Sequence, residues 1–170
     1  MIRNALLWPW SVLYGLALRL RHLLYDIGAL HSSPGALPTV VLGNLTVGGT
    51  GKTPLTELLV REMEQLIGPG SVGILSRGYG RKSKGFHWVD ALDHAIDVGD
   101  EPLMLRRKMP HVAVAVCEDR LKGLMRMRQE NPDLKWVICD DALQHRSLVP
   151  TVSILVLDEA GCRVQGSVVP

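Results

Sequence analysis

The chain has 170 residues, of which 46% are hydrophobic and 21% are charged. This length fits about one domain, and the composition argues against a disordered tail, a collagen-like fibre and a polytopic membrane protein. The net charge of +2 is too balanced for a typical nucleic-acid-binding protein, so no nucleic-acid partner is expected. The three cysteines form no CxxC pair, and an odd number does not make a secreted disulfide framework, so a reduced, cytosolic compartment fits best.

Residues 1–30 predict an amphipathic helix that lies on a membrane surface. After Pro9, one helical face carries Leu13, Leu16, Leu20, Leu24 and Ile27, and the opposite face carries Ser11, Gly15, His22 and Asp26. Four of the eight aromatic residues also fall here, where amphipathic rings suit a membrane interface. The uncharged run 4–18 is shorter than the ~20 residues of a membrane-spanning helix. The alternative is a helix docked on the protein's own core.

After a break at residues 32–38, short β-branched runs alternate with helical patterns. The predicted strands are 39–42, 72–75, 112–116, 136–139 and 152–157. Leucine spacing predicts a helix over 55–66, closed by Gly68-Pro-Gly70, and another around 121–125. Apolar strands without strict alternation are typical of parallel strands that are buried on both faces. Residues 31–170 are therefore predicted to form one α/β domain, a three-layer sandwich with a mainly parallel sheet and ligands at the carboxyl ends of its strands.

A phosphate-binding loop is predicted between the first of these strands and the first helix. Residues 46–53, TVGGTGKT, match the pattern GxxxxGK[ST] except that Thr46 replaces the first glycine. The predicted nucleotide-binding residues are Thr46, Val47, Gly48, Gly49, Thr50, Gly51, Lys52 and Thr53. We expect Lys52 to reach the β- and γ-phosphates of ATP and Thr53 to hold Mg²⁺. The alternative is a glycine-rich turn with a chance GKT sequence.

Two acidic segments are the next candidates for chemistry. The strand 136–139 ends in Asp140 and Asp141, an arrangement typical of the Walker B acids that hold Mg²⁺. In the segment Gly99-Asp-Glu-Pro102, the carboxylates could take a proton from an attacking hydroxyl. The alternatives are a solvated strand end at Asp140 and a helix N-terminus capped by Asp100.

Five segments in chain order carry a resemblance to a known family: 43–54 (GNLTVGGTGKTP), 76–82 (SRGYGRK), 99–102 (GDEP), 118–120 (EDR) and 140–145 (DDALQH). Together they resemble the tetraacyldisaccharide 4'-kinases, the lipid A 4'-kinases. The resemblance covers the N-terminal hydrophobic helix and nearly all of the chain as far as Leu157. The resemblance implies a P-loop NTPase-like fold that uses ATP and Mg²⁺. It also implies transfer of the γ-phosphate of ATP to the 4'-hydroxyl of a tetraacyldisaccharide 1-phosphate in lipid A biosynthesis, forming lipid IVA. The implied location is the cytoplasmic face of the bacterial inner membrane, as a peripheral protein.

The same resemblance implies roles for individual residues. Asp100 corresponds to the catalytic carboxylate, and Lys52, Asp140 and Asp141 complete the catalytic group. Thr53, Asp140 and Asp141 correspond to the metal-binding residues. The residues expected to contact the substrate are Arg77, Arg81, Glu101, Arg120, Gln144 and His145. A solvated basic loop is the alternative for Arg77 and Arg81.

Family members are longer and have a second lobe, whose histidine partners the catalytic aspartate. The chain therefore resembles an N-terminal portion of the family. By itself it is expected to show little phosphorylation of the lipid. A membrane-associated ATPase of the deviant Walker type is disfavoured because it requires lysine where Val47 stands. A GTPase is disfavoured because no NKxD sequence follows Thr53. A catalytically inactive fragment that binds nucleotide or membrane stays open, and only turnover separates it from a kinase.

Overall fold

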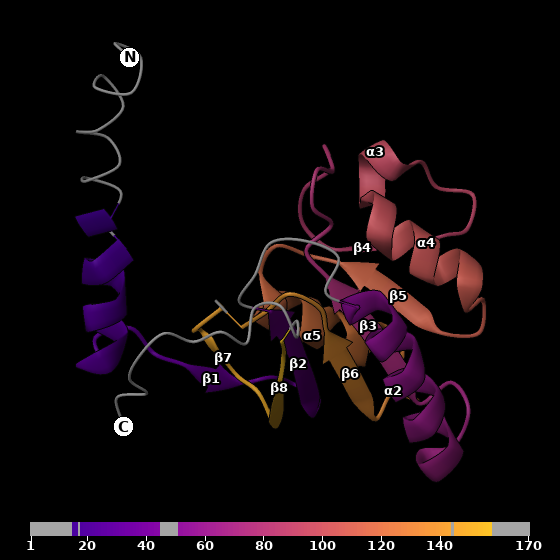
Figure 1. The fold of residues 1–170 in the computed structure, drawn as a ribbon, viewed down its shortest axis with the longest axis horizontal. Helices are drawn as coiled ribbons and strands as arrows, with labels where there is room; N and C mark the ends of the chain where they lie inside the picture. Colours follow the sequence, from indigo (N-terminus) through magenta and orange to yellow (C-terminus); the bar gives the residue numbers. More distant parts are fainter. Residues whose placement is uncertain (1–14, 17, 45–50, 144, 158–170) are drawn as a thin grey trace. The chain divides into compact units, whose positions relative to one another are not determined.

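The computed structural model of the chain describes residues 15–16, 18–44, 51–143 and 145–157 (Figure 1). The chain divides into two compact units, Met1–Ser33 and Pro34–Pro170. In the first unit, residues 15–16 and 18–26 are helical, as predicted, and Gly28 follows the helix with a φ of 74°. Ser11 and Leu13 of the predicted helix lie outside the described residues. Within the described ranges, no helix combines the length and hydropathy that a membrane span requires.

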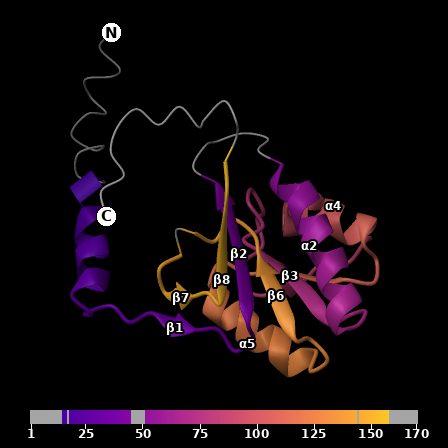
Figure 2. The same cartoon turned by 60° about the horizontal axis from the view of Figure 1, so that its bottom comes forward.

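A six-stranded sheet in the order β4-β5-β3-β6-β2-β8 forms the centre of the second unit. Its strands β3, β6, β2 and β8 can be followed side by side in Figure 2. Five strands run parallel to one another: β2 (Thr39–Asn44), β3 (Val72–Ser76), β5 (Ala113–Val116), β6 (Trp136–Cys139) and β8 (Val152–Val156). They confirm the five predicted strands, with ends that differ by at most two residues. The edge strand β4 (His87–Trp88) pairs antiparallel with β5. β1 (Ser33–Pro34) and β7 (Leu148–Val149) form a two-stranded sheet.

Of the four helices among the described residues of this unit, two are the crossovers of the parallel sheet. They are α2 (Lys52–Ile67), between β2 and β3, and α5 (Arg120–Glu130), between β5 and β6, and both confirm predicted helices. The sequence patterns did not predict α3 (Ala95–Val98), and they offered the start of α4 (Asp100–Lys108) only as the alternative interpretation of residues 99–102. The first is a single turn, and the second is too short for a clear apolar period. Acidic residues in its first turn and basic residues in its last complement the dipole of α4.

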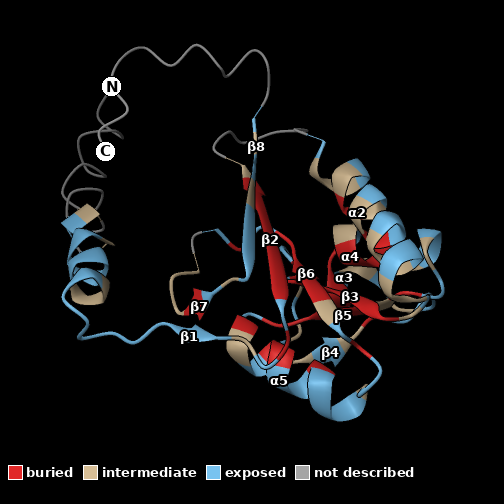
Figure 3. Cartoon of the chain, turned by 90° about the horizontal axis from the view of Figure 1, so that it is seen from below, coloured by how far each residue is buried: buried red, intermediate tan, exposed pale blue. Residues whose placement is uncertain are grey.

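The core has two layers, one on each face of the sheet, because successive strand residues point to opposite faces. On one face, Val40, Leu42, Ile74, Val114 and Ile138 pack with residues of α2, α3 and α4. On the other face, Val41, Leu75, Ala115 and Val137 pack with Leu124 and Met127 of α5. Figure 3 shows the buried residues concentrated in the central strands, between these helices. The predicted three-layer α/β sandwich is therefore confirmed.

Candidate functional site

The predicted site residues follow strands that end at the same edge of the sheet. β6 lies between β2 and β3, and Cys139, its last residue, is in register with Val41 and Leu75. The chain beyond β6 stays aligned with β3, because the Asp140 N–H donates to the Leu75 carbonyl at 3.1 Å. The segments after β2, β3, β5 and β6 therefore converge, as expected for a ligand site in a parallel α/β sheet.

The start of α2 has features of a phosphate-binding helix N-terminus. Gly51 occupies the N-cap position with a φ of 77°, in the left-handed region that favours glycine, and no described side chain caps the helix. The first turn carries no acidic residue, so its N–H groups and the positive end of the helix dipole can face an anion. The predicted contacts Thr46–Thr50 lie outside the described residues.

The first two residues of α2 contact acidic residues from two distant segments. Lys52 Nζ donates to Asp141 Oδ1 at 3.1 Å. Thr53 Oγ1 donates to Glu101 Oε1, near the start of α4, at 2.8 Å. The structure thus brings together residues that lie 89 and 48 positions apart in the sequence, and these two contacts could not be predicted from any local pattern.

Asp140 is a buried acid with an unused oxygen. Its exposed fraction is 3%, and its Oδ1 has no hydrogen-bond partner among the described residues. Burial, together with the nearby Glu101 carboxylate, raises the pKa of Asp140 to about 6, although Lys52 and Arg120 oppose this shift. A buried carboxylate oxygen without a partner suits a cation. The neighbouring Asp141 has a φ of 48°, which is uncommon outside glycine.

The donor set fits Mg²⁺ that is shared with a phosphate ligand. Thr53, Asp140 and Asp141 supply hydroxyl and carboxylate oxygens, the ligand type that Mg²⁺ prefers. In the described part of the chain, no three His, Cys, Asp or Glu side chains form a group that could hold a metal ion by themselves. Mg²⁺ commonly binds through one or two carboxylates, with substrate phosphates and water completing its shell.

Asp100 is exposed at the start of α4, next to Glu101. The N-cap of this helix is Gly99, so Asp100 is the first helical residue and the alternative in which Asp100 caps the helix is wrong. Its neighbour Glu101 reaches Thr53. The catalytic role of Asp100 stays a prediction.

The other predicted substrate contacts lie in different environments. Arg77 is exposed directly after β3, and Gln144 lies outside the described residues. His145 is half-buried, and its main-chain N–H donates to the Ala142 carbonyl at 2.9 Å. The structure therefore leaves Arg77 accessible to a ligand.

The two remaining arginines are held within the protein. The Arg81 side chain is 3% exposed and pairs with Glu118 at 2.9 Å. Arg120 is 2% exposed and donates to the carbonyls of Cys117 at 2.6 Å and Asp140 at 3.0 Å. Burial lowers the pKa of the Arg120 guanidinium. Sequence reasoning assigned no role to Glu118, although an acid directly after β5 was a usable signal.

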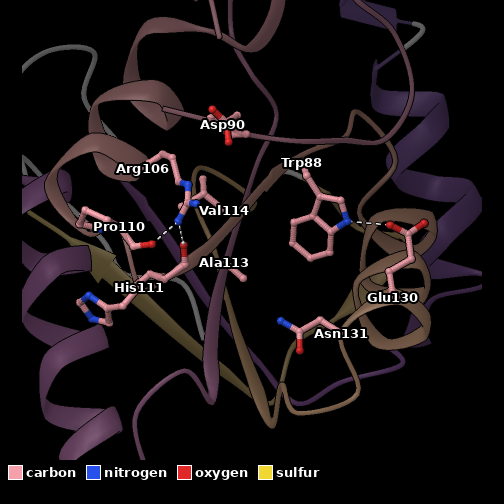
Figure 4. A pocket seen from close by; sticks show the side chains of 11 residues that line it. Trp88, Asp90, Arg106, Pro110, His111, Ala113, Val114, Glu130 and Asn131 are labelled. Carbon is pink, nitrogen blue, oxygen red and sulfur yellow. Dashed lines mark hydrogen bonds between the residues drawn. The ribbon is translucent and has the colours of Figure 1, made fainter. Parts of the chain in front are cut away.

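Two cavities lie away from these strand ends. The larger, of about 470 Å³, is near the amino end of β5 and is bordered by Trp88, Arg106 and Glu130 (Figure 4). Trp88 Nε1 donates to Glu130 Oε2 at 2.6 Å. The second, of about 420 Å³, lies along α2 and includes Glu64 and His111. Neither contains a predicted site residue, so neither belongs to the candidate site.

Comparisons with known proteins agree with this geometry. The family described as "LpxK: Tetraacyldisaccharide-1-P 4'-kinase" matches residues 3–170. The tetraacyldisaccharide 4'-kinase of Parabacteroides distasonis is 43% identical over 159 residues, which cover 91% of this chain and 42% of that protein. The tetraacyldisaccharide 4'-kinase of Cytophaga hutchinsonii is 46% identical over 154 residues, covering 90% of this chain and 43% of that protein.

A solved structure shares the fold. The "apo" form of LpxK from Aquifex aeolicus, crystallised in complex with ATP, superposes with a TM-score of 0.76 and 37% sequence identity. The match covers 94% of this chain and 50% of that one. This chain therefore spans about half the length of that protein, and less than half the length of the two curated relatives. On these grounds, the chain belongs to the tetraacyldisaccharide 4'-kinase family.

Proposed function

We propose that this chain supplies the nucleotide site and the acceptor-activating carboxylate of an ATP-dependent lipid kinase. The proposed reaction transfers the γ-phosphate of ATP to the 4'-hydroxyl of tetraacyldisaccharide 1-phosphate. The hydroxyl oxygen forms a bond to the γ-phosphorus, the bond to the β,γ-bridging oxygen breaks, and ADP leaves. The observation that carries the proposal is the convergence of Lys52, Thr53, Glu101 and the Asp140–Asp141 pair at one edge of the sheet.

In this reaction, the start of α2 binds the phosphates. Lys52 pairs with Asp141 at 3.1 Å, and ATP phosphates would compete with that carboxylate for the ammonium group. Thr53, Asp140 and Asp141 would hold Mg²⁺, which neutralises phosphate charge when it is bound. The unpartnered Oδ1 of Asp140 supports its place among these residues.

Asp100 accepts the proton of the attacking hydroxyl. Its carboxylate is exposed, as contact with a second substrate requires, and it precedes the residue that bonds to Thr53. Positioned general bases commonly contribute 10²–10⁴-fold to a rate. The acceptor side of the site is thus tied to the nucleotide side through Glu101.

The N-terminal helix holds the enzyme on the cytoplasmic face of the inner membrane, where an acylated disaccharide resides. Leu16, Leu20, Leu23 and Ile27 are 55%, 57%, 53% and 66% exposed, and the helix also presents Arg19 and Arg21 to solvent. An exposed apolar stripe beside cationic groups is typical of helices that bind anionic membrane surfaces.

The kinase proposal is tested by following phosphate transfer from γ-labelled ATP to purified tetraacyldisaccharide 1-phosphate. The assay uses this chain followed by the carboxyl-terminal remainder of the Parabacteroides distasonis relative, and this chain alone. Asp100→Ala is expected to lower kcat by 10²–10⁴-fold with unchanged ATP affinity, whereas the exposed Asp133→Ala is a matched control. ADP formation without a 4'-phosphorylated lipid would instead favour an ATPase. Normal turnover by Asp100→Ala would remove this residue from the mechanism.

Membrane binding is tested by co-sedimentation with phosphatidylglycerol vesicles. The triple substitution of Leu16, Leu20 and Leu23 by serine is expected to abolish binding, because burial of the apolar stripe provides the attachment. Leu66→Ser is the control, since this leucine is 84% exposed on α2. If the triple variant still sediments with vesicles, the membrane-binding surface lies elsewhere.

A further inference from the structure

The loop between β3 and β4 is closed by a buried arginine. Arg81 donates to Glu118 Oε1 at 2.9 Å, to the Gly85 carbonyl at 2.7 Å and to Ser83 Oγ at 3.2 Å. The second carboxylate oxygen of Glu118 accepts the Gly85 N–H at 3.0 Å. One ion pair therefore binds residues 81–85 to the end of β5.

Both partners of this pair are charged. Burial raises the pKa of Glu118, but the N–H groups of Glu118 and Gly85 and the Arg81 guanidinium outweigh it, so the pKa lies below its ordinary value. The Arg81 side chain is 3% exposed, and its guanidinium is directed at protein acceptors. This geometry favours a structural role for Arg81 within the protein, in place of the substrate contact that the sequence predicts.

The same loop holds the helical turn α3 through its main chain. The Lys82 N–H donates to the Ile96 carbonyl at 2.7 Å, and the Ser83 hydroxyl donates to the Asp97 carbonyl. A helix of four residues cannot satisfy its last carbonyls internally. The loop supplies the missing donors and so fixes the end of α3.

The loop also contacts the residue that precedes Asp100. Gly99 has a φ of 93°, and a Cβ there would lie 3.1 Å from the Gly78 Cα and 3.2 Å from the Tyr79 carbonyl oxygen. Gly78 has a φ of 70°, and its Cβ would lie 2.8 Å from the Val98 carbonyl oxygen. Two main-chain segments touch without room for a side chain. The position of the loop therefore determines where α4, and with it Asp100, begins.

We infer that Arg81 and Glu118 are positioning residues that hold residues 95–101, and thereby Asp100, against the loop 77–85. This inference rests on the proposed role of Asp100 as the proton acceptor. The ion pair touches neither Lys52 nor Thr53, the proposed nucleotide contacts. Loss of the pair is therefore expected to affect the acceptor side and spare ATP binding.

Amide hydrogen exchange in this chain tests the mechanical part of the inference. In Arg81→Met and Glu118→Gln, exchange at the amides of Lys82 and Gly99 is expected to rise about 10-fold or more, while amides of β3 and β6 keep their protection. Arg81→Lys keeps the positive charge and is expected to retain part of the protection from exchange at these amides. Arg61→Met is the matched control, because Arg61 is an exposed arginine that pairs with Glu62 at 3.6 Å on α2, away from the loop. Unchanged exchange over 95–101, or an equal rise throughout the sheet, would overturn the inference.

Two further measurements separate positioning from general stability. In the chain labelled with ¹³C-aspartate, the Asp100 carboxyl resonance is expected to shift in Arg81→Met and to stay in place in Arg61→Met. In the kinase assay, Arg81→Met is expected to lower kcat about 10-fold without changing the KM for ATP, and to cause no further loss when combined with Asp100→Ala. An increase in the KM for the lipid at unchanged kcat would make Arg81 a substrate contact and overturn the positioning role.

Asp100→Ala and Arg81→Met together distinguish a failure of this inference from a failure of the proposed function. If Asp100→Ala leaves phosphate transfer intact, the role of Asp100 fails, although the exchange data still show whether the ion pair holds residues 95–101. If Asp100→Ala abolishes transfer but Arg81→Met leaves kcat and the Asp100 resonance unchanged, the proposed function stands and the positioning role is wrong.

Discussion

At the ends of β2 and β6, Lys52 and Asp140 retain capacity for a ligand, whereas Arg81 and Arg120, which follow β3 and β5, are used within the protein. Lys52 pairs with an exposed carboxylate, and Asp140 keeps an oxygen without a partner among the described residues. By contrast, the Arg81 and Arg120 side chains are almost fully buried, and both terminal nitrogens of each guanidinium contact protein acceptors, although their Nε atoms have no partner among the described residues.

The difference indicates how one edge of the sheet can bind a ligand with some of its charged residues and hold the surrounding chain in position with others. A buried charge without full compensation is unfavourable and gains free energy when a ligand of opposite charge arrives. A buried charge with several partners gains little from a ligand and holds its surroundings rigid. We therefore expect substitutions in the β2 and β6 half to change ligand binding, and those in the β3 and β5 half to change local structure.

The largest expected effect is on nucleotide binding by Lys52→Met. Removing the ammonium group is expected to weaken MgATP binding about 100-fold, which corresponds to about 2.7 kcal/mol. Calorimetry of this chain measures it, with Lys108→Met as control because Lys108 pairs with Glu57 away from the strand ends. An unchanged Kd in Lys52→Met would contradict the phosphate-binding assignment.

The next effect concerns stability in the other half. Arg120→Met keeps much of the side-chain volume but removes the donors to the Cys117 and Asp140 carbonyls. Leaving buried acceptors unsatisfied is expected to lower the free energy of unfolding by about 2 to 3 kcal/mol, as measured by urea denaturation. A loss no greater than that of Arg61→Met, which removes an exposed arginine of α2, would show that Arg120 does not support the end of β6.

Asp140→Asn is expected to raise the free energy of unfolding above about pH 4, whereas Arg120→Met lowers it. Asp140 has a pKa of about 6 in the folded chain, above its unfolded value of about 3.9, so the native state binds the extra proton between these values. Its contribution to stability therefore falls as the pH rises from about 4 to 6 and stays unfavourable above that. In metal-free buffer, the asparagine variant is expected to be more stable at pH 8, on the order of 2 kcal/mol.

A measurement at low pH is the control for the comparison between Asp140 and its asparagine variant. Below about pH 4, Asp140 is protonated in both states, and the stability difference between it and asparagine is expected to disappear. Thermal unfolding at pH 3.5 and pH 8 in the presence of a chelator checks both values. A difference that does not depend on pH would indicate that hydrogen bonding, and not the buried charge, sets the stability of this position.

The smallest expected effect lies outside both halves. Lys108 pairs with Glu57 at 2.8 Å, with side chains that are 52% and 31% exposed. Exposed pairs contribute about 0.2–1 kcal/mol, so Lys108→Met is expected to change the urea midpoint little. A loss as large as that of Arg120→Met would remove the distinction between buried and exposed charges on which the comparison depends.

Local patterns in the sequence were sufficient for the parallel strands and their crossover helices. Apolar β-branched runs form buried strands, and the helical spacing of leucines predicts α2 and α5, because burial of an apolar face stabilises one periodic backbone over another. Leu55 and Leu59 of α2 and Leu124 of α5 pack in the core, whereas Leu58 and Leu66 are exposed. The alternation of these elements predicts a parallel sheet, and that places Lys52 and Asp140 near one edge before any coordinates are known.

The pairing of residues at that edge was decided only by the tertiary structure. The chain returns to place β6 between β3 and β2, and no local pattern encodes that order. It determines that Thr53 bonds to Glu101, that Arg81 bonds to Glu118 and that Arg120 is buried beneath Asp140. A charged residue looks the same in sequence whether it faces solvent, a ligand or a buried carbonyl, because its partners come from strands that meet only in the folded sheet.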